Sequence, residues 1–159
     1  MQMNTKEMIE ELLYQNAEDF EMAKVLKADI AEYFTTLDET FSTSDGKDFL
    51  VKHTHKIDEI IKLIYKIALY GMFKSYQPMK NSLPLSIAAL GSYGREQLCV
   101  HSDIDLLIVY REMPGYNTKE IIEKILYLIW DCGLKLGHRV HTVDAVSYTH
   151  LTLPTICSV

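Results

Sequence analysis

The sequence lacks the features that mark secreted and membrane proteins. Its three cysteines show no C-x-x-C spacing, so free thiols in a reducing compartment are expected rather than a disulfide framework. Its longest apolar run, "IIKLIYKIALYGMF", is interrupted by Lys62 and Lys66 and is too short to span a bilayer. The acidic start, "MQMNTKEMIEELLYQNAEDF", does not resemble a secretory signal. These absences predict a cytoplasmic protein with no membrane partner.

Positive charge is also scarce. Lys and Arg number 16 against 22 Asp and Glu, which gives a formal net charge of −6. Nucleic-acid binding through a broad surface needs cations that neutralise phosphates, often interleaved with aromatic residues. The composition therefore argues against a nucleic-acid partner, but it is compatible with a small nucleotide held by a metal ion.

The first half of the chain has helical periodicity. Residues 5–37 predict one or two amphipathic helices, "FSTSDGKDF" predicts a loop, and residues 49–75 predict a further helix. We expect these helices to pack rather than to form sites. The apolar face of the last one would comprise Ile57, Ile60, Ile61, Ile64, Ile67 and Ala68.

Two histidines in this helix, His53 and His55, could suggest a metal site. Residues two apart on a helix do not face the same ligand, however, and the sequence offers no third ligand nearby. We therefore expect both to be surface side chains.

The spacing of apolar residues changes from a helical to a strand-like pattern after Pro84. The apolar runs "LSIAALGS" and "IDLLIVY" predict buried strands, and "HRVHTV" predicts a third. Between the last two, Asn117 and Glu120 form a capping-box-like pair at the start of a helix that ends near Gly133 to Gly137. This order predicts an α+β protein, in which a helical segment precedes a sheet with flanking helices.

Two aspartates, Asp103 and Asp105, stand at the start of the second predicted strand. Side chains two apart on a strand share a face, so the two carboxylates would converge while Ile104 points to the core. Converging carboxylates repel each other unless a cation lies between them, and carboxylate oxygens are ligands that Mg²⁺ prefers. Two such ions can stabilise the attacking and leaving oxygens of a phosphoryl displacement.

The stretch "GSYGR" supplies a phosphate-binding element. It follows a strand and opens a turn or short helix, where backbone N–H groups bind anions. Gly91 allows close approach of a phosphate, Ser92 can donate its hydroxyl, and Arg95 can pair with a phosphate in forked geometry. A D-x-D or a G-S turn alone is common on protein surfaces. Together, in this order between two apolar strands, they predict nucleotidyl transfer.

The stretch "LGSYGREQLCVHSDIDLLIVY" resembles the signature of the polymerase-β-like nucleotidyltransferase superfamily. With the later "LYLIWDCGLKLGHRVHTV", it is most similar to the N-terminal catalytic domain of the bifunctional PII-protein uridylyltransferase/uridylyl-removing enzymes. The resemblance covers residues 86–145. Two positions depart from it, because Ser92 stands where that family often has a second glycine and His141 where it often has arginine.

The resemblance implies a bacterial enzyme that transfers UMP from UTP to a tyrosine of the PII signalling protein in response to nitrogen status, with Mg²⁺ or Mn²⁺. It makes Asp103 and Asp105 the catalytic metal ligands and assigns the nucleotide to Gly91, Ser92, Arg95 and Ser102, the last two as supporting residues. The superfamily also uses a third carboxylate from a later strand. The sequence does not place this carboxylate, because Asp144 lies just past the last predicted strand.

We interpret the end of the chain as the translation of a sequencing adapter rather than as natural protein. One codon choice for "VSYTHLTLPT", residues 146–155, reproduces a transposase sequencing adapter. We therefore expect a helical segment over 1–80, an incomplete nucleotidyltransferase core over 81–145, and a non-native tail over 146–159. A fold truncated in this way is expected to be poorly active. The alternative is a genuine strand and tail, because "SYTHLTL" alternates in polarity.

Other functions remain open at this point. The chemistry also fits an adenylyltransferase of the glutamine-synthetase type or a small-molecule nucleotidyltransferase, and the residues do not distinguish UTP from ATP. "GHRVHTV" favours the uridylyltransferase branch. A non-catalytic regulatory nucleotide-binding module would be marked by loss of a carboxylate, and both visible carboxylates are present.

Overall fold

A computed structural model describes residues 4–72, 84–112, 114–115, 117–148 and 157–158. The helical half consists of α1 (Thr5–Tyr14), α2 (Asp19–Thr35), α3 (Leu37–Thr43) and α4 (Gly46–Met72). The second half runs through β1 (Leu85–Ala89), α5 (Gly91–Gly94), β2 (Ile104–Tyr110), α6 (Thr118–Asp131), β3 (Leu136–Thr142), α7 (Val143–Tyr148) and β4 (Cys157–Ser158). No helix in the described part of the chain is long and apolar enough to cross a membrane.

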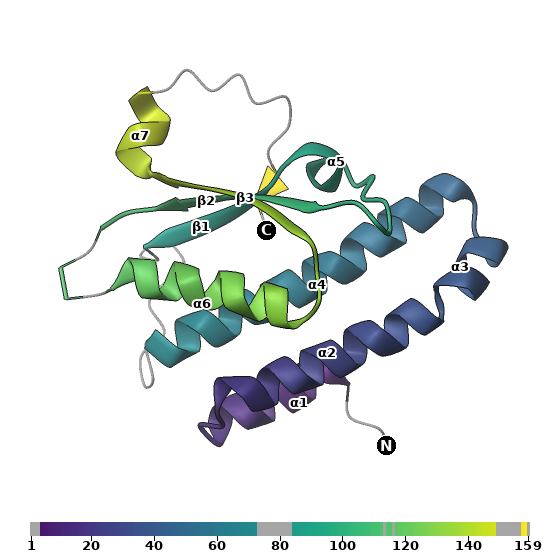
Figure 1. The fold of residues 1–159 in the computed structure, drawn as a ribbon, viewed down its shortest axis with the longest axis horizontal. Coiled ribbons are helices and arrows are strands. Elements are labelled where there is room, and N and C mark those ends of the chain that lie inside the picture. Colours follow the sequence, from purple (N-terminus) through teal and green to yellow (C-terminus); the bar gives the residue numbers. More distant parts are fainter. Residues whose placement is uncertain (1–3, 73–83, 113, 116, 149–156, 159) are drawn as a thin grey trace.

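The strands form one mixed sheet in the order β3-β2-β1-β4. β1 is antiparallel to both β2 and β4, whereas β2 and β3 are parallel. Figure 1 shows α4 and α6 on one side of the sheet and α5 and α7 on the other. The predicted α+β class, with a helical segment followed by a mixed sheet and flanking helices, is confirmed.

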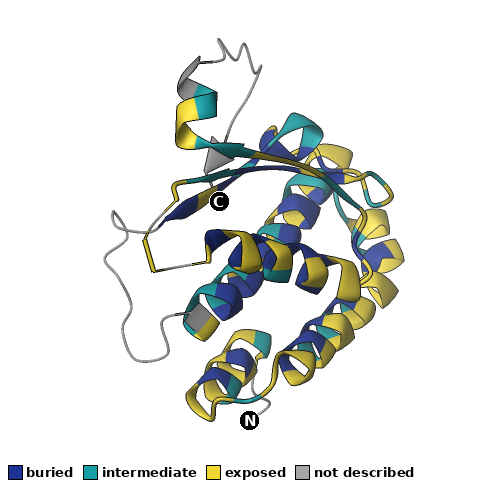
Figure 2. Cartoon of the chain, turned by 60° about the vertical axis from the view of Figure 1, so that its left-hand side comes forward, coloured by how far each residue is buried: buried dark blue, intermediate teal, exposed yellow. Residues whose placement is uncertain are grey.

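A single apolar core joins the helices to the sheet. The predicted apolar face of α4 is buried, with Ile57, Ile60, Ile61, Ile64, Ile67 and Ala68 each no more than 2% exposed. The same cluster includes Leu26 of α2, Ile108 of β2 and Ile125 of α6. Figure 2 shows buried residues along the inner sides of the helices and in the sheet.

Two helix starts follow from their capping residues. The side chain of Asn4 accepts from the Glu7 N–H, and the Glu7 carboxylate accepts from the Asn4 N–H, which completes a capping box. At α6, the predicted cap is confirmed, because the Asn117 side chain accepts from the N–H of Glu120.

The predicted loop over residues 41–49 is largely wrong. α3 continues the helical chain to Thr43, and α4 begins at Gly46, earlier than expected. Buried Leu37 anchors α3, and the ring of Phe41 packs edge-on against Phe49 of α4, with centroids 5.2 Å apart. These packing contacts outweigh the turn propensity of the Ser, Thr and Gly residues. The predicted helix end near Ser75 lies outside the described residues.

The predicted surface position is wrong for His53 and correct for His55. His53 is only 2% exposed, stacks on the rings of Tyr33 and Phe49, and its Nδ1 lies 2.9 Å from the Tyr33 hydroxyl. His55 is exposed, and its Nε2 lies 3.0 Å from Glu96 Oε1. The two side chains thus have different neighbours.

Candidate active site

The aspartate pair lies at the start of β2. Asp103 directly precedes the strand, Asp105 is its second residue, and both are exposed. Ile104 between them is 3% exposed and Leu106 is fully buried. Because strand side chains alternate between faces, this burial pattern turns Asp105 away from the core that α4 and α6 cover.

Two glycines flank the carboxylate of Asp105. Gly91, the first residue of α5, has a φ of +57°, and a Cβ built on it would lie 3.1 Å from Asp105 Oδ2. A Cβ on Gly137 of β3 would overlap Asp105 Oδ1. The backbone also joins these elements, because the Leu90 N–H donates to the Asp105 carbonyl at 2.9 Å. The carboxylate therefore sits between the first residue of α5 and the second residue of β3, with no room for a side chain on either.

The predicted phosphate-binding stretch forms a closed turn beside this carboxylate. The N–H of Gly94 donates to the Leu90 carbonyl at 3.0 Å. The Ser92 carbonyl accepts from the N–H of Arg95 at 3.3 Å and of Gln97 at 2.9 Å. Ser92 itself is half-buried, whereas Arg95 is exposed just after α5. The structure thus brings Gly91 against Asp105 and leaves the guanidinium of Arg95 in solvent.

Two side chains of helix α4 form hydrogen bonds with this turn and with the segment that follows it. The buried Tyr93 hydroxyl donates to Asp58 Oδ1 at 2.6 Å, and the Leu98 N–H donates to the hydroxyl of Thr54 at 3.2 Å. Burial, followed by the hydrogen bond and charge of Asp58, raises the pKa of Tyr93 far above its ordinary value. The hydroxyl therefore stays protonated as a donor. These bonds fix the turn after β1 to a helix that is itself buried in the core.

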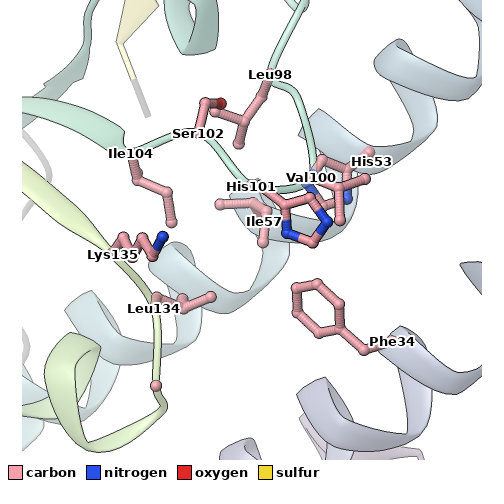
Figure 3. Close-up of a pocket in the computed structure, with 11 residues that line it drawn as sticks. Phe34, His53, Ile57, Leu98, Val100, His101, Ser102, Ile104, Leu134 and Lys135 are labelled. Atoms are coloured by element: carbon pink, nitrogen blue, oxygen red, sulfur yellow. The ribbon is translucent and has the colours of Figure 1, made fainter.

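Ser102, predicted as a supporting residue, has a local partner. Its hydroxyl and its N–H both approach the Cys99 carbonyl, at 2.8 and 3.0 Å. Together with Ile104, it lines a cavity of about 210 Å³ that also borders Phe34 of α2 and His53 of α4 (Figure 3). Its hydroxyl is engaged in the turn before Asp103, and its contact with a nucleotide stays a prediction.

The donor set at this site suits a hard divalent cation. Carboxylates from Asp103 and Asp105 are oxygen ligands, and a cation such as Mg²⁺ completes its shell with phosphate oxygens and water. The described residues contain no group of three or more His, Cys, Asp or Glu side chains that could hold a metal ion. Asp144 lies in the first turn of α7 and is exposed. The two carboxylates would thus supply part of the oxygen shell of such a cation.

A family model matches the second half of the chain. The sequence model of a family described as a nucleotidyltransferase domain matches residues 72–153, more than half of the 159 residues. The chain belongs to this family. Asp103, Asp105 and the turn at Gly91 all lie within the matched region.

Several similar proteins carry the name bifunctional uridylyltransferase/uridylyl-removing enzyme. The protein from Bradyrhizobium diazoefficiens is 33% identical over 124 residues, which is 77% of this chain and 13% of that protein. The one from Azospirillum brasilense is 33% identical over 101 residues, 62% of this chain and 10% of that protein. The one from Pseudomonas putida is 47% identical over 60 residues, 38% of this chain and 7% of that protein. The chain thus spans a small part of these relatives' length.

Two features of the site were missed at the level of sequence. The position of Gly137 beside Asp105 follows only once β2 and β3 are known to be parallel in the register Asp105↔Gly137. The Tyr93–Asp58 bond joins residues 35 apart in the chain, and no local pattern reveals such a pair.

Proposed function

We propose that this nucleotidyltransferase domain transfers UMP from UTP to a tyrosine of the PII signalling protein, in the bacterial cytoplasm. The observation that carries the proposal is the carboxylate of Asp105, held between Gly91 and Gly137 in a domain whose relatives are named uridylyltransferases. In this assignment Asp103 and Asp105 hold Mg²⁺ or Mn²⁺. Gly91 and Ser92 bind the triphosphate, with Arg95 and Ser102 as supporting residues.

The reaction is an in-line displacement. The tyrosine hydroxyl oxygen forms a bond to the α-phosphorus of UTP, its proton passes to solvent, and the bond to the bridging oxygen of the leaving pyrophosphate breaks. Asp103 and Asp105 would hold a divalent cation, which would supply neutralisation of charge on the attacking and leaving oxygens. The chain's own part is to fix the carboxylates and to keep the turn at Gly91 open to a phosphate, since a side chain there would meet Asp105.

Metal and nucleotide binding test this assignment. We expect Mg²⁺ and UTP to strengthen each other's binding in isothermal titration calorimetry. The substitution Asp105→Asn should weaken both at least about tenfold, because loss of outer-shell partners alone costs metal affinity about that much. Asp144→Asn removes another exposed carboxylate, from α7, and should leave both affinities unchanged. Wild-type affinities in Asp105→Asn would contradict the proposal.

The same titration with ATP in place of UTP tests which nucleotide base the domain prefers. Tighter binding of UTP supports the uridylyl assignment, and transfer of labelled UMP to purified PII by the full-length protein would establish the acceptor. Preferential transfer of AMP would instead identify the domain as an adenylyltransferase.

A further inference from the structure

Arg139 lies on the same face of the sheet as Asp105. β2 and β3 are parallel, with Asp105 opposite Gly137 and Leu107 opposite Arg139. Gly137 closely approaches the Asp105 carboxylate, so the two residues lie on the same face of the sheet. Arg139 is two residues after Gly137 in β3 and therefore shares that face. His138, between them, turns to the other face, where its ring packs edge-on against Trp130 of α6 at 6.0 Å. Arg139 therefore projects to the side that carries α5 and α7 (Figure 1).

The spacing brings Arg139 within reach of a ligand at Asp105. Strands rise about 3.3 Å per residue and lie about 4.8 Å apart, so the two Cα atoms are separated by roughly 8 Å. His141 shares the face but lies two residues further away, at the level of Val109. Arg139 is exposed, and in the described part of the chain no ion pair or hydrogen bond engages its guanidinium.

Arg139 and the turn at Gly91 lie on opposite sides of Asp105. The sheet order places β3 on one side of β2 and β1, which leads into Gly91, on the other. A triphosphate with its terminal phosphates at the turn by Gly91 would reach Arg139 with its α-phosphate if it crossed Asp105 towards β3. A planar guanidinium binds two phosphate oxygens at once, which suits that position.

We infer that Arg139 binds the α-phosphate of the nucleotide, across the metal site from Gly91. This inference rests on the proposed nucleotidyl transfer and deepens it. Charge accumulates on the α-phosphate oxygens as the acceptor oxygen approaches and pyrophosphate departs, and a fixed cation beside them stabilises that charge.

The test is calorimetric titration of the 159-residue chain at saturating Mg²⁺ with UTP, UMP and inorganic pyrophosphate. Arg139→Ala should weaken UTP and UMP binding about tenfold, as expected for loss of a charge-assisted hydrogen bond, and leave pyrophosphate binding unchanged. Arg139→Lys keeps the charge without the fork and should lose less. Arg111→Ala is the matched control, because it removes an exposed arginine at the other end of β2 and should bind like the wild type.

The outcomes separate this inference from the function on which it rests. If the wild-type chain binds no UTP, the proposed function and this inference both fall. If the wild type binds UTP and Arg139→Ala binds it equally well, the inference alone is overturned. An equal loss of pyrophosphate affinity in Arg139→Ala would also overturn it, because the contact would then lie with the leaving group.

Discussion

Asp105 is confined by its neighbours, and no hydrogen bond to its carboxylate comes from the part of the chain that the structure describes. Gly91 needs glycine for two reasons, since its φ is +57° and a Cβ would crowd Asp105. Gly137 has no left-handed backbone, so only the space beside Asp105 requires glycine there. A substitution at Gly137 therefore changes the space beside Asp105, the proposed metal ligand, without requiring a change of backbone conformation.

The substitution Gly137→Ala should move the Asp105 carboxylate without unfolding the protein. The new methyl group would overlap Oδ1, and the end of a side chain can rotate away. We expect Mg²⁺ affinity to fall about tenfold, as for other changes that reorient a ligand. The unfolding free energy should stay within about 1 kcal/mol of the wild type, because Gly→Ala also restricts the unfolded chain.

Calorimetry with Mg²⁺ and urea denaturation measure the two effects. Gly46→Ala is the control, because a Cβ there meets nothing within 4 Å. Unchanged Mg²⁺ affinity in Gly137→Ala would show that Asp105 is not a metal ligand.

The chemistry-bearing residues were easier to predict than their supports. Asp103, Asp105 and Gly91 stand close in sequence between two apolar runs, so their proximity follows from local spacing. Gly137 reaches Asp105 only through the pairing of β2 with β3, and a single sequence does not contain that register. His53 was misplaced because its burial depends on packing against Tyr33 of α2, a separate helix, as well as on Phe49 of its own helix α4.

At the scale of elements, α4 acts as the support of the turn that contains α5. The Tyr93–Asp58 hydrogen bond joins this four-residue helix to a 27-residue helix packed in the core. A helix of four residues has too few internal hydrogen bonds to hold its own position. The position of Gly91 and Ser92 therefore depends on α4.

The substitution Tyr93→Phe should weaken nucleotide binding several-fold while leaving the affinity for Mg²⁺ alone nearly unchanged. It removes a hydrogen bond to a charged group, worth about 1.5–3 kcal/mol, and leaves Asp58 half-buried without that donor. Tyr65→Phe is the matched control, since its hydroxyl donates to the Leu85 carbonyl at 2.9 Å at the far end of β1. Tyr65→Phe should lose stability but keep UTP affinity. Equal UTP affinities in the two variants would make the Tyr93 bond purely structural.

The sequence pattern predicts the strand β2 correctly but misses the short helix α3. β2 matches its predicted run, residues 104–110, because continuous apolar character and flanking polar residues define both ends. α3 was missed because its sequence, "LDETFST", favours a turn locally, and only Leu37 and Phe41 reveal its packing. Tertiary contacts override local propensity most readily in such short segments.

At the scale of the whole molecule, one core spans both predicted parts of the chain. Buried residues of α1, α2 and α4 belong to the same cluster as those of the sheet and α6. The predicted boundary at residues 80–81 and the adapter origin of residues 146–159 stay predictions. A perturbation inside the shared core should affect the stability of the helices and of the sheet together.

His53 provides such a perturbation through pH. Burial lowers the pKa of its imidazole below the ordinary value of 6.5, so the folded protein favours the neutral ring. As the pH falls below about 6.5, the unfolded chain takes up a proton that the folded chain resists, and stability is lost until the lower folded-state pKa is reached. Among the described residues, the polar groups beside the ring are the Tyr33 hydroxyl and, along the shared cavity, His101 and Lys135, and none of these carries a negative charge that would offset the effect.

The unfolding free energy, measured in urea at pH 7.5 and at pH 5.5, tests this linkage. We expect the wild type to lose stability on acidification and His53→Phe to lose less, because a phenyl ring keeps the stacking on Tyr33 and Phe49 but cannot take up a proton. His55→Gln, which removes an exposed histidine from the same helix, should behave like the wild type. Far-UV circular dichroism and the fluorescence of Trp130 should report the same midpoint, since helices and sheet share the core. An identical pH dependence in the wild type and His53→Phe would remove His53 as the source of acid sensitivity.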